Sequence, residues 1–178
     1  MRTTLVILAL LSIATPASAR PRAAGPAILS SGAVFEVANP DFTTPIDREY
    51  KVSFEISQAS TSPDQVNVAL NSVARFVNMH AMAGVPREKI RAAVVVHGSA
   101  GWELLDDVAY RAKHGVDNPN AALIREFTAF GARVILCGQT AASRGIPRGG
   151  LIDEVEVALS AMTAFVVLQE EGYRVNPW

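Results

Sequence analysis

The sequence predicts one α/β domain built on a mostly parallel sheet of about five strands. Short apolar or alternating segments recur along the 178 residues, and segments with helical spacing separate them. Two of the strand segments are continuous apolar runs, which is typical of strands covered on both faces in a parallel sheet. Strands that alternate with helices form right-handed crossover units, so we expect helices on both faces of the sheet.

The first half of the domain predicts two strands. Tyr50 to Ile56 alternates apolar and polar residues with period two, which indicates a strand with one covered face. Residues 62–64 form a good helix start, and helical spacing continues from there until residues 84–86 end it. Residues 92–98 are a continuous apolar strand that ends in His97 and Gly98. A short helix is expected over 102–105, and the polar stretch 110–118 is expected to be a loop.

The second half repeats the alternation. Asn118-Pro119-Asn120 opens a helical pattern that runs to Phe130 and ends at Gly131. The next strand is Arg133 to Cys137. The remaining elements are, in order, a short helix at 140–144, a loop at 146–150, a short strand at 155–157, an apolar helix at 158–171 and a last strand at 173–175.

The N-terminus has the pattern of a secretory signal peptide over residues 1–19. Arg2 supplies the positive end, residues 5–14 the apolar stretch, and Ala17-Ser18-Ala19 the cleavage site. The apolar run is short for a bilayer, and no later segment could replace it, so no membrane span is expected after its removal. We therefore expect an exported protein, periplasmic or secreted, with an uncleaved N-terminal anchor as the alternative.

Residues 20–48 are expected to form an extended arm, because four prolines interrupt a stretch with little periodicity. Residues 49–178 make up the α/β domain. Removing 19 of 178 residues leaves 159, a usual size for one domain, with 15 basic against 17 acidic residues. A charge near −2 gives no basic surplus, so nucleic acid and anionic membranes are not expected partners.

Cys137 is the one cysteine of the chain, so no internal disulfide can form and zinc sites of several cysteines are excluded. No C-x-x-C motif, glycine-rich phosphate loop or G-x-S-x-G turn is present. We therefore predict no metal and no cofactor, and a thiol that is either buried and inert, free to react, or paired with another molecule.

Cys137 and His97 are the candidate catalytic residues, because each ends a buried strand. The carboxyl ends of parallel strands border the ligand crevice, and a helix that follows Cys137 would point its N–H groups at the sulfur and favour the thiolate. If the strands are neighbours, His97 could accept the thiol proton or stabilise the thiolate. The alternatives are that Cys137 packs as a small hydrophobe and that His97 only bonds to the backbone.

Four further residues are candidate ligand contacts. Gly138 and Gln139 follow Cys137 in the predicted turn. Arg144, together with Arg148, could fold back over the same edge, lower the pKa of the thiol and attract an anion. Asn118 could donate its amide to a ligand.

These candidates also have structural interpretations. The two arginines could instead be solvated, or paired with Asp153 and Glu154. Asn118 or Asn120 could simply cap the following helix.

Several motifs, in order and spacing, resemble the DsrE/DsrF-like family of small sulfur-relay proteins over about Tyr50 to Val175. They are Val96-His97-Gly98, Asn118-Pro119-Asn120, the segment Gly131 to Gln139 containing Leu136-Cys137-Gly138, and the ending Leu168 to Tyr173. The resemblance implies a three-layer α/β/α domain that assembles as a homo-oligomer, often a trimer or hexamer. It further implies that a cysteine, matched here by Cys137, accepts sulfur as a persulfide and passes it to a partner protein.

Two functions remain open at this point. The first is a sulfur-handling protein, a persulfide carrier or sulfane-sulfur binder acting through Cys137 with a donor or acceptor protein, and more a carrier than a turnover enzyme. The second is a non-catalytic oligomeric module that binds a small ligand or a partner, with Cys137 as a packed wall. A hydrolase or metal enzyme is disfavoured, because no nucleophile, base and orienting group are found together.

Overall fold

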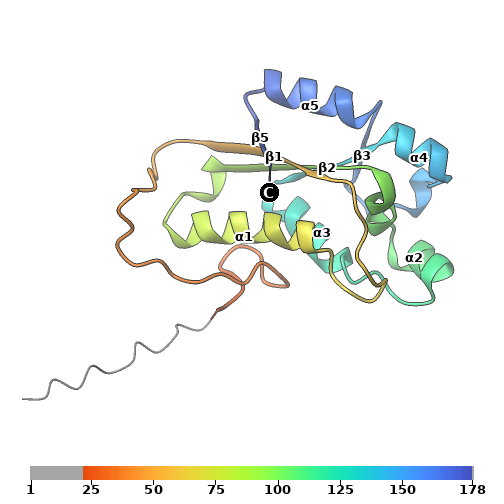
Figure 1. Ribbon diagram of the computed structural model, residues 1–178, viewed down its shortest axis with the longest axis horizontal. Helices are drawn as coiled ribbons and strands as arrows, with labels where there is room; N and C mark the ends of the chain where they lie inside the picture. The colour runs from red at the N-terminus through yellow and green to blue at the C-terminus, as the bar shows by residue number, and fades with distance from the viewer. Residues whose placement is uncertain (1–21, 178) are drawn as a thin grey trace, which may run out of the picture.

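A five-stranded, entirely parallel sheet lies between helices in the computed structural model, which describes residues 22–177. The strand order is β4-β3-β2-β1-β5. Figure 1 shows α5 on one face of the sheet and α1 and α3 on the other. The predicted fold class, a parallel sheet of about five strands within three layers, is therefore confirmed. The predicted signal peptide, residues 1–19, lies outside the described residues.

The strands match the segments expected from the sequence, with small shifts at their ends. Their bounds are β1 Tyr50–Ile56, β2 Ile90–Val96, β3 Arg133–Cys137, β4 Glu156–Ala158 and β5 Arg174–Asn176. The strand order places β4 and β5, which have three residues each, at the two edges of the sheet. The apolar strands β2 and β3 therefore lie inside it, as expected for strands covered on both faces.

The helices connect these strands and cover the sheet. Their bounds are α1 Val68–Met82, α2 Asp107–His114, α3 Ala121–Phe130, α4 Gly138–Arg144 and α5 Ala161–Glu170, with the shorter 3₁₀ helices η1 Arg87–Lys89, η2 Gly98–Leu104 and η3 Arg148–Gly150. The connection from β4 to β5 passes through α5 and returns the chain from one edge of the sheet to the other.

The segment 110–118 was expected to be a loop, and that expectation is wrong for its first half. Asp106 accepts a hydrogen bond from the Ala109 amide and begins α2, and Gly115, with φ of 78°, ends it. Only Tyr110 of this short helix is buried, so the helix has too few apolar residues to show a helical period.

The main core lies between the sheet and the α1–α3 layer. It contains Phe54, Val94 and Leu136 from the central strands, with Ile124 and Phe127 from α3, all nearly inaccessible to solvent. A second core lies under α5 and is small, consisting of Ala93, Val95, Ile135, Ala164 and Leu168. Successive side chains of β2 and β3 point to opposite faces of the sheet and so enter different cores. We call the face under α1 and α3 the thick face and the face under α5 the thin face.

The arm is partly fixed to the thick face. The Asn78 side chain, fully buried in α1, accepts hydrogen bonds from the amides of Ala27 and Ile28 and donates to the carbonyls of Ile28, Ser31 and Gly32. Ile28 itself is fully buried. Residues 36–48 of the arm loop away from the helices and are largely exposed, as Figure 1 shows at its left side.

No helix between residues 22 and 177 combines the length and the apolar character needed to cross a membrane.

Candidate functional site

Cys137 lies at the carboxyl edge of the sheet, where three segments meet. It ends β3 and pairs in register with Ala158, the last residue of β4. After Ala158 the chain turns through Leu159 and Ser160 into α5, so the first turn of α5 lies over the sulfur. Cys137 is only 6% exposed.

The sulfur is held by hydrogen bonds from the starts of two helices. Burial alone would raise the pKa of the Cys137 thiol, because it disfavours the charged form. The backbone amides of Thr140 and Ala161, the hydroxyl of Thr140 and the amide of Gln139 outweigh burial, so the pKa is lowered from its ordinary value of 9.0. These donors favour a thiolate, and they include α5 as a second source of N–H groups beside α4.

Thr140 connects this cysteine to the end of β2. Its hydroxyl oxygen accepts a hydrogen bond of 3.1 Å from the amide of Gly98, which leaves the hydroxyl proton available for the sulfur. Thr140 is the third residue after Cys137, the helix N-cap, so its amide is one of the unpaired donors of α4. The sequence analysis did not single out Thr140, although the spacing from a cap residue to the third helical position was visible.

Gly138 has a packing role at this site. A Cβ atom on Gly138 would lie 2.5 Å from the carbonyl oxygen of Ala158 and 3.2 Å from that of Leu159. Only glycine therefore allows α4 to begin against the β4–α5 connection, which brings the Ala161 amide to the sulfur. The ligand contact predicted for Gly138 is not tested by these distances.

His97 and Cys137 lie next to each other across two neighbouring strands. The pair Val96 and Leu136 is in register between β2 and β3, and His97 and Cys137 each follow by one residue. The predicted neighbourhood of the two strand ends is therefore found. However, the described residues include no hydrogen bond between the two side chains. Instead, His97 Nε2 lies 2.8 Å from Oε1 of Glu55, a residue of β1 that the sequence analysis did not identify.

The other predicted ligand contacts are spread more widely. Gln139 is exposed, and its side-chain amide donates to the carbonyl of Leu159 at 3.3 Å, while its backbone amide bonds the sulfur. Arg144 ends α4 and Arg148 begins η3, and both are exposed. Within residues 22–177 neither arginine forms a hydrogen bond or ion pair, and neither contributes to the lowered pKa of Cys137.

Asn118 has a structural role that differs from the predicted ligand contact. Its side-chain amide donates to the carbonyls of Glu103 at 2.8 Å and Leu105 at 2.6 Å, and its side-chain oxygen accepts the amide of Asn120. Both amide protons are therefore used inside the fold. The carbonyl partners come from η2 and the residue that follows it, whereas the N-cap of α3 is Asn120, whose side chain makes no capping hydrogen bond.

A buried carboxylate organises the loops beside these asparagines. Glu103, 2% exposed, accepts hydrogen bonds from the amide and hydroxyl of Ser60 and from the side chains of Asn67 and Asn120. Burial, with the charge of Glu103 as the next cause, raises the pKa of Tyr110 to about 12. The network fastens the β1–α1 loop to η2 and α3, and sequence periodicity gives no signal for it.

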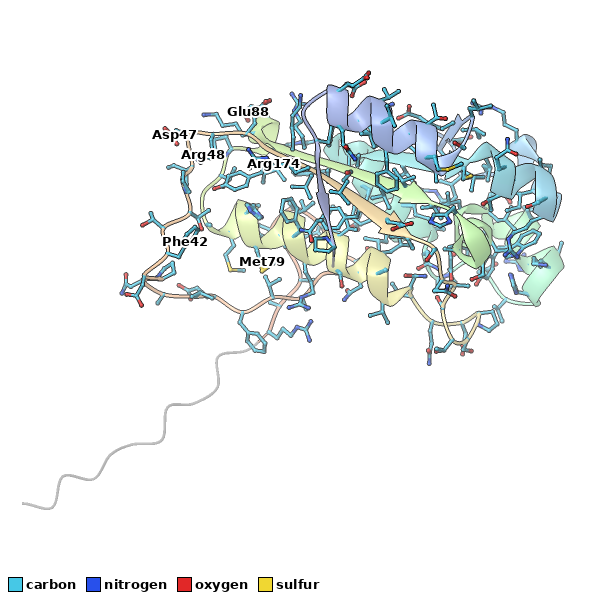
Figure 2. All side chains as sticks on the ribbon, turned by 45° about the horizontal axis from the view of Figure 1, so that its top comes forward. Phe42, Asp47, Arg48, Met79, Glu88 and Arg174 are labelled. Atoms are coloured by element: carbon cyan, nitrogen blue, oxygen red, sulfur yellow. The ribbon has the colours of Figure 1, made fainter. Side chains whose placement is uncertain are left out.

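A separate cavity of about 620 Å³ lies at the opposite, amino end of the sheet. Its lining includes Phe42 of the arm, Arg48, the start of β1 and Arg174 of β5. Figure 2 shows Arg48 and Arg174 at this end, with Phe42 on the arm loop. Its lining includes no cysteine or histidine, so its size does not make it the centre of thiol chemistry. Within residues 22–177 no group of three His, Cys, Asp or Glu side chains could hold a metal ion.

Comparison with known proteins agrees with the fold. The model of the DsrE/DsrF-like family matches residues 51–177. A solved structure of a protein of unknown function from Methanobacterium thermoautotrophicum is 25% identical, with a TM-score of 0.53. That similarity covers 72% of this chain and 98% of the other. No curated protein matches the chain.

The matched region covers all five strands except Tyr50, the first residue of β1, and it includes both His97 and Cys137. It supports a role related to sulfur relay in general. Because the match extends over more than half of the sequence, the chain belongs to the DsrE/DsrF-like family.

Proposed function

We propose that the protein is a persulfide carrier in which Cys137 accepts a sulfane sulfur from a donor and passes it to an acceptor protein. The observation that carries this proposal is the placement of Cys137 at the carboxyl edge of the sheet with the starts of α4 and α5 around its sulfur. These donors lower the pKa of the thiol, and the thiolate is the form that attacks sulfur. Four hydrogen-bond donors around one cysteine are more than a packed wall residue requires.

The transfer needs no external oxidant. The Cys137 thiolate attacks the outer sulfur of a donor persulfide in its protonated form, R–S–SH. A bond forms between Sγ and that sulfur, the donor S–S bond breaks, and its electron pair leaves on R–S⁻, which takes up a proton. The products are the Cys137 persulfide anion and R–SH, so one sulfur atom moves and the charge balances.

The same donors support the loaded state. The persulfide carries its negative charge mainly on the outer sulfur, and amides at a helix start favour a negative charge nearby. The amide of Ala161 begins α5, a helix of ten residues, and adds to the donors of the α4 turn. The same donors can therefore stabilise Cys137 both as the free thiolate and as the persulfide, without a metal or a second cysteine.

Mass spectrometry of the intact protein tests this function. The reduced wild type, incubated with glutathione persulfide and desalted, is expected to gain the mass of one sulfur atom. Cys137→Ser is expected to gain none. Unfolded wild type is the matched control for an ordinary thiol, and it should react more slowly at neutral pH. A folded wild type that gains no sulfur contradicts the proposal.

A second proposal concerns assembly, and the surface of α5 favours it. Met162 of α5 is 77% exposed, and Val166 and Val167 of the same helix are also exposed. Leu159, in the turn between the edge strand β4 and α5, is exposed as well. Exposed apolar patches of this kind often mark protein–protein contacts. We infer that copies of the chain associate through this face, as a trimer or hexamer.

Light scattering during size-exclusion chromatography measures the assembly directly. The wild type is expected to elute as an oligomer, and Met162→Lys together with Val166→Glu is expected to shift it toward the monomer. A wild type that is monomeric at micromolar concentration contradicts association. Export, proposed from residues 1–19, is checked by fractionating cells that express the full chain.

A further inference from the structure

Glu55 and His97 form a polar pair on the face of the sheet that also carries Cys137. Ser53, Val95 and Ile135 all point to the α5 side, and the alternation of β strands places Glu55, His97 and Cys137 on that same side two residues later. Neighbouring strands are about 4.8 Å apart, so His97 lies between the carboxylate and the thiol. Figure 1 shows β1, β2 and β3 in this order.

We propose that Glu55 is a positioning residue for His97, holding the ring so that His97 donates a proton to the thiolate that leaves during sulfur transfer. The inference rests on the function proposed above. The 2.8 Å contact engages Nε2 of His97 with Oε1 of Glu55. Nδ1 has no hydrogen-bond partner within residues 22–177, so it is the ring nitrogen that can serve the substrate.

The pair of Glu55 and His97 supplies a proton for the leaving group, which the Cys137 thiolate cannot supply. The sulfur is already stabilised by amides and the Thr140 hydroxyl, so it does not need His97 as a base. The leaving R–S⁻ does need a proton when it comes from an alkyl thiol. In the balanced step, the protonated ring gives that proton to R–S⁻ and becomes neutral, and solvent returns a proton to the ring afterwards.

Solvent and substrate can both reach the pair. The side chain of His97 is 28% exposed and that of Glu55 is 57% exposed. The charged groups that face the ring are Glu55 from β1 and the Cys137 thiolate from β3, and the first turn of α5 contains no acidic residue. Glu103 of η2 is buried in its own hydrogen-bond network. Glu55 is therefore the carboxylate available to fix the ring.

The test compares two reactions of the same thiolate. Glutathione persulfide releases a basic alkyl thiolate, whereas a nitro-substituted aromatic disulfide releases a thiolate that needs no proton. His97→Ala is expected to slow sulfur uptake from the persulfide by about 100-fold, the low end for general acid catalysis. Glu55→Gln is expected to slow it by about 10-fold. Both variants should react with the aromatic disulfide within about twofold of the wild type.

Two controls separate positioning from a general structural effect. Glu49 precedes β1, is 53% exposed and pairs with Arg91 at 3.9 Å, so Glu49→Gln removes a comparable carboxylate away from the site. It should leave both reactions unchanged. The double variant Glu55→Gln with His97→Ala should be no slower than His97→Ala alone, because Glu55 acts through the ring.

Failure of the role proposed for Glu55 can be distinguished from failure of the proposed persulfide function. A wild type that takes no sulfur from the persulfide defeats the persulfide function. A wild type that takes sulfur, with Glu55→Gln equally fast, overturns the role of Glu55 and leaves that function standing. Two further results also overturn the positioning role. In the first, the double variant is slower than His97→Ala by the full factor that Glu55→Gln shows alone. In the second, Glu55→Gln slows the reactions with the persulfide and with the aromatic disulfide equally.

Discussion

The two faces of the sheet differ in both packing and chemistry. The face under α1 and α3 buries large apolar residues, and it also carries the docked arm around Asn78. The face under α5 has a core of five residues, and the groups Glu55, His97 and Cys137 lie at its edge. Stability is therefore concentrated on one face and reactive groups on the other, so variants of the site can be tested with little loss of folding.

Phe127→Ala should produce the largest effect and sharpen this contrast. Phe127 is fully buried in the thick core, and its removal is expected to lower the free energy of unfolding by about 3–5 kcal/mol. Denaturant unfolding followed by circular dichroism measures it. A loss below about 1 kcal/mol would contradict the importance of this face.

Asn78→Ala tests whether the arm belongs to the thick face. The substitution leaves two amides and three carbonyls of residues 27–32 without their partner, and is expected to cost about 2–3 kcal/mol. Hydrogen exchange should increase in residues 27–32 first. Asn71→Ala is the milder control, because Asn71 accepts one amide, that of Gly32. If both variants lowered the free energy of unfolding equally, Asn78 would not be the residue that fixes the arm to the thick face.

Thr140→Val probes the thin face without removing the thiol. Loss of the hydroxyl donor should raise the pKa of Cys137 toward its ordinary value, with alkylation at neutral pH slower by up to about 10-fold. The rate of iodoacetamide labelling against pH measures this. His97→Ala should leave the labelling curve near that of the wild type, because no contact between His97 and the sulfur lowers this pKa. If the pKa of Cys137 shifted strongly in His97→Ala and not in Thr140→Val, His97 rather than Thr140 would be the group that lowers this pKa.

The lowered pKa of Cys137 also predicts how stability depends on pH. A group whose pKa is lower in the folded protein adds stability that is complete above its unfolded value, near 9.0, and is lost as the pH falls through the folded value. The stability of the wild type relative to Cys137→Ser should therefore rise with pH up to about 9. Paired urea titrations along a pH series measure it, and a difference that stays flat would contradict a stabilised thiolate.

Met162→Ser should have the smallest effect on the single chain. Met162 is 77% exposed on α5, so the stability of the monomer should change by no more than about 0.5 kcal/mol. Unfolding at the lowest measurable protein concentration checks this. A larger loss that depends on protein concentration would show that the residue is covered in an assembly.

The sequence predicted what depends on local pattern and missed what depends on strand order. Apolar runs located β2 and β3, and therefore His97 and Cys137 at strand ends. Glu55 was not identified, because its importance arises from β1 lying beside β2. The Ala161 amide was missed for a related reason, since β4 had to lie beside β3 before α5 could start over the sulfur.

The β4–α5–β5 connection also sets the order in which the site is completed during synthesis. Cys137 is made well before Ala161, the residue whose amide reaches the sulfur from across the β4 turn. The last described strand, Arg174–Asn176, then pairs with the first, β1, and fixes the far end of α5. A nascent chain that ends after β3 would thus carry a thiol without this donor, and the thiolate reaches its full stabilisation only when α5 has folded.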